Sequence, residues 1–147
     1  MITYTDISSK EIVLIRELWI KNKEYHEELE ENFKEQYAHL VFEERIKGIL
    51  EGQKELKITI AKVEDRIVGY CLSSIVGNVG EVVSLHVLEN QRGKGIGIAL
   101  TQLHIDWMKD KQCKEIGLYV ASGNEKTINF YRKLGLHPNL VYMQLKE

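Results

Sequence analysis

Three glycines occupy alternate positions in the segment NQRGKGIGIAL, which runs from residue 90 to residue 100. Gly93, Gly95 and Gly97 leave the backbone bare, and Arg92 and Lys94 put positive charge beside it. Backbone N–H groups at the start of a helix bind anions, and the absence of Cβ atoms lets a phosphate approach closely. The segment therefore indicates a phosphate site, although the same pattern also fits a glycine-rich turn without a ligand.

Spacing argues against two well-known phosphate-binding loops. A P-loop requires GxxxxGK followed by Ser or Thr, but here Ile96 follows Gly95 and Lys94 precedes it. The dinucleotide-binding pattern GxGxxG fails because Ile98 stands where a third glycine is needed after Gly93. A nucleotide triphosphatase that binds ATP with Mg and a dehydrogenase are therefore both disfavoured.

The periodicity of apolar residues predicts a mixed α/β sheet of the α+β kind around this segment. Alternating patterns indicate six strands, over residues 2–7, 56–61, 67–76, 81–89, 114–120 and 139–146. Apolar residues at helical spacing indicate four helices, over residues 8–22, 29–49, 96–111 and 124–134. Three consecutive strands form an antiparallel meander that runs directly into the glycine segment.

Length and composition are those of one soluble domain spanning residues 1–147. Twenty basic and 22 acidic residues give a net charge of -2, which argues against a nucleic-acid partner. Cys71 and Cys113 lie far apart, with no histidine at metal-ligand spacing, so we expect no metal. No segment has the length of a membrane span or the pattern of a targeting signal, which indicates a cytoplasmic protein.

The residues of two blocks carry a resemblance to a known family. The strand EVVSLHV followed by RGKGIG resembles the RxxGxG signature of the GCN5-related N-acetyltransferases (GNAT family), with Arg92, Gly95 and Gly97 at the defining positions. A second block is similar to the family's later helix motif at matching spacing, with Asn124, Thr127, Phe130, Tyr131, Gly135 and Leu136. The resemblance covers essentially the whole chain. It implies a mostly antiparallel central sheet, splayed between the fourth and fifth strands, with helices on both faces and a bulge in the fourth strand.

The resemblance implies transfer of the acetyl group of acetyl-CoA to a primary amine of a small molecule or peptide. The coenzyme's pyrophosphate would be bound by backbone N–H groups of the glycine segment, namely Arg92, Gly93, Lys94, Gly95, Ile96 and Gly97. Its pantothenate arm would pair with the backbone of Leu85, His86 and Val87 as an added strand does. Asn124 would contact the coenzyme in addition to capping its helix.

Two proton transfers require catalytic groups, because an alkylammonium must lose a proton before it attacks and the departing thiolate gains one. The resemblance makes Tyr131 the general acid, although its helical spacing also fits a core aromatic residue. The resemblance makes Glu81, at the start of the fourth strand, a candidate general base, and the alternative is an ordered water that His86 or Ser84 could position.

The acceptor amine is not defined by these motifs. The acidic run KEYHEELEENFKE, residues 23–35, usually forms a solvated helix face, but acidic groups facing the cleft would favour a cationic acceptor such as a polyamine, aminoglycoside or basic peptide end. A noncatalytic acyl-CoA sensor of the same fold is the alternative, against which the presence of Tyr131 and Glu81 argues. The apolar segment 139–146 is compatible with a homodimer formed through a sheet edge.

Overall fold

The computed structural model describes all residues from 1 to 147. Its centre is a sheet of five strands in the spatial order β1-β2-β3-β4-β5. Their bounds are β1 (Ile2–Ile7), β2 (Glu55–Val63), β3 (Arg66–Val76), β4 (Val79–Val87) and β5 (Glu115–Gly117). Neighbouring strands from β1 to β4 are antiparallel, whereas β5 is parallel to β4. Because the first four strands follow the chain order, only the step from β4 to β5 requires a crossover, and α4 supplies it.

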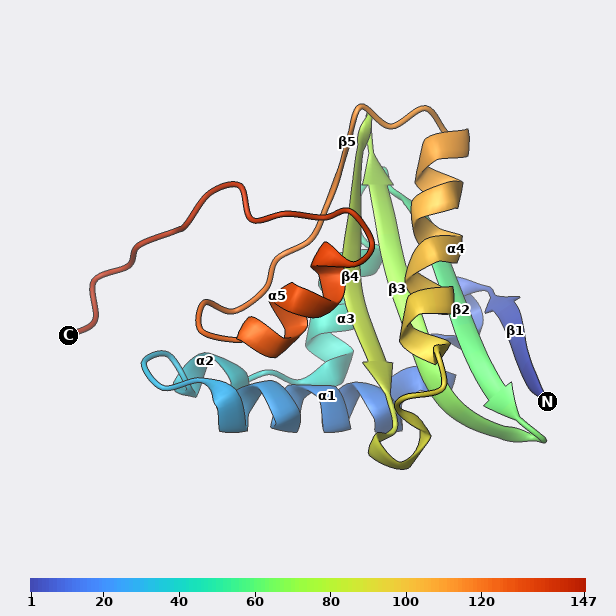
Figure 1. Cartoon of the computed structure of the whole chain (residues 1–147), viewed down its shortest axis with the longest axis horizontal. Helices are drawn as coiled ribbons and strands as arrows, with labels where there is room; N and C mark the ends of the chain where they lie inside the picture. Colours follow the sequence, from blue (N-terminus) through green and yellow to red (C-terminus); the bar gives the residue numbers. More distant parts are fainter.

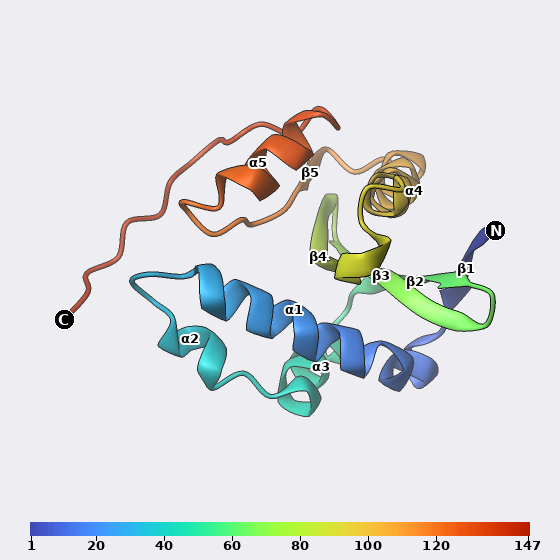
Figure 2. The same cartoon turned by 60° about the horizontal axis from the view of Figure 1, so that its bottom comes forward.

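Helices cover both faces of this sheet (Figures 1 and 2). Their bounds are α1 (Arg16–Leu29), α2 (Glu35–Ala38), α3 (Phe42–Leu50), α4 (Ile96–Asp110) and α5 (Glu125–Arg132). A 3-10 helix over Ser9–Ile15 leads into α1. Helix α4 packs on one face against β2, β3 and β4, while α1 packs on the other face against β3 and β4. The predicted α/β class, with helices on both faces, is confirmed.

One apolar core of 21 buried residues joins the sheet to these helices. The ring of Trp19 in α1 meets that of Phe42 in α3 edge to face, with their centroids 5.4 Å apart. On the opposite side of the sheet, Leu100 and Met108 of α4 are fully buried. The core therefore holds α1 and α4 firmly against β4, the strand that leads into the glycine segment.

Strands β4 and β5 separate after a short shared stretch. They pair only over residues 79–81 of β4 and 115–117 of β5. Beyond Glu81 the outer edge of β4 pairs with no strand, and the pairing of β4 with β3 skips Val83, which forms a β-bulge. The splay between the fourth and fifth strands and the bulge in the fourth are confirmed.

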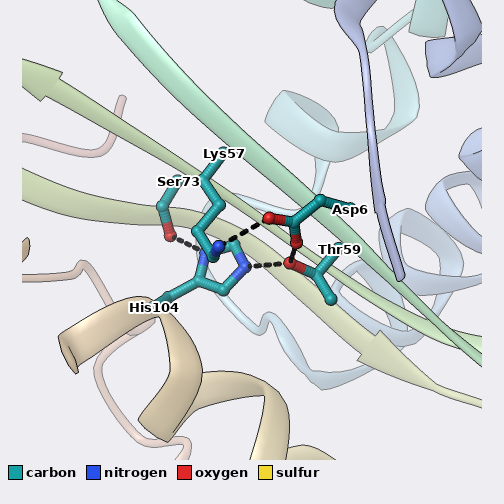
Figure 3. Close-up of polar contacts among 5 residues, drawn as sticks. All are labelled: Asp6, Lys57, Thr59, Ser73 and His104. Atoms are coloured by element: carbon teal, nitrogen blue, oxygen red, sulfur yellow. Dashed lines mark hydrogen bonds and ion pairs between the residues drawn. The ribbon is translucent and has the colours of Figure 1, made fainter. Parts of the chain in front are cut away.

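A buried chain of hydrogen bonds ties α4 to the sheet (Figure 3). His104 Nδ1 lies 2.6 Å from Ser73 Oγ, and His104 Nε2 lies 2.9 Å from Thr59 Oγ1. The Thr59 hydroxyl donates to Asp6 Oδ1 at 2.6 Å, and Lys57 donates to the other oxygen of Asp6 at 2.7 Å. The chain connects α4, β3, β2 and β1.

The direction of each donor in this chain follows from the Asp6 carboxylate, which can only accept. The hydroxyl proton of Thr59 points to Asp6, so its oxygen accepts from the Nε2–H of His104. Burial lowers the pKa of His104 to about 3, which keeps the ring neutral, and its Nδ1 therefore accepts from Ser73. Every donor points toward Asp6.

The strand predicted over residues 139–146 is not formed, so that prediction was wrong. After α5 the chain continues to residue 147 without a helix or strand and runs away from the sheet (Figure 1). Leu140 and Met143 expose 89% and 85% of their surface. Alternation alone does not make a strand, because its backbone must also find an edge to pair with, and this segment meets none within the chain.

The predicted helix over residues 29–49 is also wrong, because the chain divides it. Helix α1 extends to Leu29, and the Glu30 carboxylate then accepts hydrogen bonds from the backbone N–H groups of Asn32 and Phe33, which turns the chain. The short helix α2 follows over Glu35–Ala38, and α3 begins only after the extended residue Val41. The fifth strand is likewise shorter than its predicted range of 114–120, because it separates from β4 after the pair of Glu81 with Gly117.

Candidate active site

The glycine segment presents a row of unused backbone donors. The N–H groups of residues 93–98 donate to no acceptor within the protein, whereas that of Arg92 is taken by the Glu89 carbonyl at 3.2 Å. Gly93 and Gly95 have φ of 81° and 79°, a left-handed conformation that favours glycine, with open space where a Cβ would stand. Gly95 is the N-cap of α4, so the positive end of that helix points into the same space. This arrangement is suited to bind an anion.

Gly97 has a different role from the two preceding glycines. It lies in the first turn of α4, and a Cβ there would stand 3.2 Å from Cζ of Phe130. The missing side chain thus allows α5 to approach the beginning of α4. The glycine segment and the second predicted block are therefore neighbours in space.

The unpaired edge of β4 leads directly to these donors. Leu85, His86 and Val87 pair with β3 on one side only, so their other edge is open to an extended partner. The Val87 carbonyl accepts a hydrogen bond from Arg92 Nε at 3.0 Å. The guanidinium of Arg92 also lies 5.1 Å above the ring of Tyr25 in α1. These contacts hold Arg92 at the end of the open edge.

Asn124 leaves a buried donor without a partner. Its Oδ1 accepts from the Thr127 backbone N–H at 3.3 Å, which caps α5 as predicted. Its Nδ2 is the one fully buried side-chain nitrogen or oxygen of the chain that has no hydrogen-bond partner. Burying such a group unpaired costs about 1–3 kcal/mol, so a bound ligand that accepts from it gains that energy back.

The side chain of Tyr131, a residue of α5, is largely buried, but its hydroxyl is accessible to solvent. The hydroxyl makes no hydrogen bond within the protein, and yet it is not among the fully buried unpaired atoms, so it reaches solvent. Burial raises the pKa of Tyr131, and the neighbouring Cys71 thiol raises it further. The phenol therefore keeps its proton at neutral pH. Its ring packs edge to face on Phe130, with the centroids 5.0 Å apart.

Glu81 lies at the opposite end of the open edge. It forms the last pair of β4 with β5, opposite Gly117, and it is half-buried. No hydrogen bond joins it to Tyr131 or to the glycine segment. The structure thus brings α5, the helix that carries Asn124 at its N-cap and Tyr131, to the glycine segment at one end of the edge and leaves Glu81 at the other.

A polar cluster between α1 and β4 was not predicted from the sequence. Asn22 donates from Nδ2 to Ser84 Oγ at 3.5 Å, and its Oδ1 lies 3.2 Å from His86 Nδ1. Ser84 Oγ is also 2.6 Å from the hydroxyl of Tyr70. Asn22 and Ser84 are separated by 62 residues, so no local pattern could have revealed the contact. The cluster occupies the face of β4 that is turned toward α1.

The acidic run 23–35 is largely solvated. Glu24, Glu28 and Glu31 are exposed, and Glu30 binds the backbone of its own turn. No three His, Cys, Asp or Glu side chains of the chain come together in a way that could hold a metal ion. The acidic run therefore adds no metal site to the polar groups of the open edge, where Glu81 is the carboxylate of β4.

Comparison with known proteins decides the family. Residues 19–136 match the acetyltransferase (GNAT) family, which is most of the chain. The chain belongs to this family. An N-alpha-acetyltransferase of Sulfurisphaera tokodaii is 33% identical over 114 residues, which are 69% of the GNAT chain described here and 65% of that relative. The GNAT chain thus spans slightly less than two thirds of that protein.

Solved structures share the fold of this GNAT chain. A mutant of the BH1408 protein from Bacillus halodurans is 20% identical, with a TM-score of 0.76 over 99% of both chains. The aminoglycoside N-acetyltransferase AAC(6')-Iy, solved in complex with CoA, is 15% identical, with a TM-score of 0.71 over 100% of this chain and 95% of that one. The chain therefore shares its overall fold with these proteins.

Proposed function

We propose that this chain is an N-acetyltransferase that moves the acetyl group of acetyl-CoA to a primary amine by direct attack. The observation that carries the proposal is the row of unused N–H groups over residues 93–98, placed at the end of an unpaired strand edge. Coenzyme A joins a pyrophosphate to an extended arm that contains amide groups. The unused N–H groups can bind an anion such as the pyrophosphate, and the unpaired strand edge can bind an extended partner such as the arm. Membership of the GNAT family supports acetyl-CoA as the donor of the acetyl group.

The residues of the chain fit coenzyme A. Gly93 and Gly95 leave open the space that a phosphate would fill, and the buried Nδ2 of Asn124 lacks an acceptor. The backbone of Leu85 and Val87 would hold the pantothenate arm along the open edge of β4. The thioester supplies the acetyl group, and the chain's own residues bind and orient it.

Acid catalysis falls to Tyr131 in this proposal. A phenol that keeps its proton at neutral pH can give it to a departing thiolate late in the reaction. Glu81 or an ordered water accepts the proton that the amine loses as it attacks. The two products are an amide and the free thiol of coenzyme A.

The acceptor is the part of the function that most needs an experiment. The relative named an N-alpha-acetyltransferase makes a peptide α-amine the first candidate, and the aminoglycoside N-acetyltransferase among the neighbours makes a polycationic small molecule the second. We propose a cationic acceptor, because both candidates carry positive charge at neutral pH.

A screen of thiol release from acetyl-CoA, with peptides, polyamines, aminoglycosides and neutral amines, tests the proposal. We expect release with at least one class and tight binding of acetyl-CoA by calorimetry. Tight binding without release for any amine would favour the noncatalytic acyl-CoA sensor, and failure to bind acetyl-CoA would contradict both functions. Release with neutral amines only would contradict the cationic acceptor.

A further inference from the structure

The cluster between α1 and β4 determines where the proton of His86 lies. Oδ1 of Asn22 is a carbonyl oxygen and can only accept, so Nδ1 of His86 must carry a proton and donate it. Asn22 has this orientation because its Nδ2 donates to Ser84 Oγ. In the neutral ring the other nitrogen, Nε2, is then bare and carries a lone pair.

Nothing in the protein uses that lone pair. The side chain of His86 is 7% exposed, and its Nε2 makes no hydrogen bond. This nitrogen is nevertheless not one of the fully buried atoms that lack a hydrogen-bond partner. Nε2 therefore reaches solvent while the rest of the ring is buried. An unprotonated imidazole nitrogen at a solvent-filled opening is an acceptor for a proton or for a water molecule.

The surroundings of His86 keep the ring neutral. Burial, together with the positive charges of Arg92, His26 and Lys21, lowers its pKa to about 4. Those groups come from α1 and from the glycine segment, and on β3 the ring faces Tyr70, whose pKa burial raises. No carboxylate is among these neighbours. The lone pair thus stays available throughout the neutral range.

The register of the sheet places His86 nearer than Glu81 to Cys71, the residue of β3 whose charge acts on Tyr131. Cys71 pairs with Leu85, the neighbour of His86 along β4. Glu81 pairs with Ser74, three positions away along β3, which corresponds to roughly 10 Å at about 3.3 Å per residue. A general acid and a general base must reach the same reacting group, and His86 meets that requirement better.

His86 and Tyr131 lie on opposite sides of the sheet, one on each side of the open edge of β4. Asn22 and Ser84 hold His86 on the α1 face, whereas Tyr131 belongs to α5, whose Phe130 packs on α4. A thioester lying along that edge would have one group on each side of its carbonyl. This is the arrangement needed to remove a proton from the attacking amine and to supply one to the leaving thiolate.

We propose that His86 accepts the amine proton through the ordered water of the mechanism above, and that Asn22 is the residue that orients it. The inference rests on the proposed acetyl transfer. The amine nitrogen forms its bond to the acetyl carbon and the C–S bond breaks. The nitrogen's proton passes to the water while a water proton passes to Nε2, and the thiolate takes the proton of Tyr131. The imidazolium then loses its proton to solvent, and the phenolate regains one.

The tautomer can be tested in the free protein, without acetyl transfer. Nitrogen-15 NMR of the histidine rings should show His86 protonated at Nδ1 at neutral pH. The variant Asn22→Ala should lose this preference, while His137→Gln, which alters an exposed ring, should leave the His86 signals unchanged. Protonation of His86 at Nε2 in the wild type would overturn the inference.

Catalysis gives the second test, in an enzyme that binds acetyl-CoA and releases thiol. His86→Gln should lower kcat about 100-fold while the dissociation constant for acetyl-CoA stays within about twofold. An unchanged kcat would overturn the role of His86 even though the acetyl transfer itself stands. Absence of thiol release in the wild type would instead contradict the proposed function, so the two failures are distinguishable.

A pH profile separates a proton acceptor from a merely structural histidine. Asn22→Asp puts a negative charge against Nδ1, which stabilises the imidazolium and raises the pKa of His86. The ratio of kcat for this variant to that of the wild type should fall about tenfold between about pH 8 and about pH 5.5. Titration of the acceptor amine affects both proteins equally, so its effect on kcat cancels in this ratio. A pH-independent ratio, or the same fall when both proteins also carry His86→Gln, would contradict the proposal.

Discussion

At the scale of single residues, Tyr131 shows how a sequence motif acquires chemical content from its environment. Its helical spacing fits a core aromatic, and the ring is indeed buried against Phe130. Its hydroxyl nevertheless reaches solvent and has no partner within the protein. The residue thus combines a fixed ring with a free proton donor, which suits the late protonation of a thiolate.

Replacement of this donor is the first prediction. Tyr131→Phe keeps the ring and removes only the hydroxyl, so we expect kcat to fall about 100-fold while acetyl-CoA binds with unchanged affinity. Thiol release and calorimetry measure the two quantities. Tyr142→Phe, which alters an exposed ring, serves as the control. Equal activity of both variants would remove Tyr131 from the mechanism.

At the scale of elements, the beginning of α4 owes its shape to glycine. Gly95 is the N-cap at φ 79°, and the space beside it is open. A side chain there meets no atom of the protein, so any cost of substitution comes from the backbone conformation and from the ligand. This is a property of the turn between β4 and α4 rather than of one contact.

The second prediction compares two glycines with equally open surroundings. Gly95→Ala forces a side chain into the left-handed region at a cost of about 1–2 kcal/mol, and we expect acetyl-CoA to bind about tenfold more weakly. Gly48→Ala in α3 has no such strain and should stabilise the fold by about 0.5–1 kcal/mol. Calorimetry and thermal unfolding distinguish them. Equal effects of the two changes would contradict this account of the glycine segment.

The buried chain in Figure 3 is the second device that holds α4, and the third prediction concerns it. Thr59→Val keeps the shape of the side chain but leaves the Nε2–H of His104 without an acceptor. Such a buried donor costs about 1–3 kcal/mol, so the free energy of unfolding in urea should fall by that amount. Thr5→Val on the exposed face of β1 should change it by less than about 0.5 kcal/mol. A smaller loss of stability at residue 59 than at residue 5 would show that this chain of hydrogen bonds does not hold α4.

At the scale of the whole molecule, stability should depend on pH through buried neutral histidines. Burial lowers the pKa of His86 to about 4 and that of His104 to about 3. The unfolded chain binds protons at the ordinary value of about 6.5, so acid favours the unfolded state. The contribution of these rings is present above about pH 6.5 and is lost as the pH falls toward the folded values.

The fourth prediction is a fall in the free energy of unfolding of about 3 kcal/mol between about pH 7 and about pH 5. Below that range Asp6 adds to the loss. Burial would raise the pKa of Asp6, but hydrogen bonds from Lys57 and Thr59 outweigh it and lower the pKa overall. Urea unfolding at both pH values measures the fall. The variant His86→Gln should reduce it by about half, and an equal stability at the two pH values would contradict the prediction.

The last segment also belongs to this scale. Five apolar side chains are exposed between residues 140 and 145, an amount that is unusual for a solvated tail. A homodimer that covers them stays a prediction, which sedimentation velocity would check. No helix of the chain is both long and apolar enough to cross a bilayer.

Much of the fold follows from the sequence because it depends on neighbours along the chain. Alternation of apolar residues determined β1 to β4, and the glycines with their charged neighbours predicted an anion site at the start of α4. The second block, with Asn124 and Tyr131, could be placed at the same site by resemblance to a family. These features depend on local periodicity, on backbone conformation and on motif spacing.

Only the tertiary structure decided which distant residues meet. Residue 22 faces β4 because α1 packs on that side of the sheet, and the bulge at Val83 sets which residues of β4 turn toward it. The proton on His86 Nδ1 follows from this contact and from no pattern in the chain. The segment 139–146 alternates like a strand and yet forms none, because pairing requires an edge from elsewhere in the fold. Register and packing between remote segments are collective properties, and they decided both the orientation of the proposed proton acceptor and the state of the final segment.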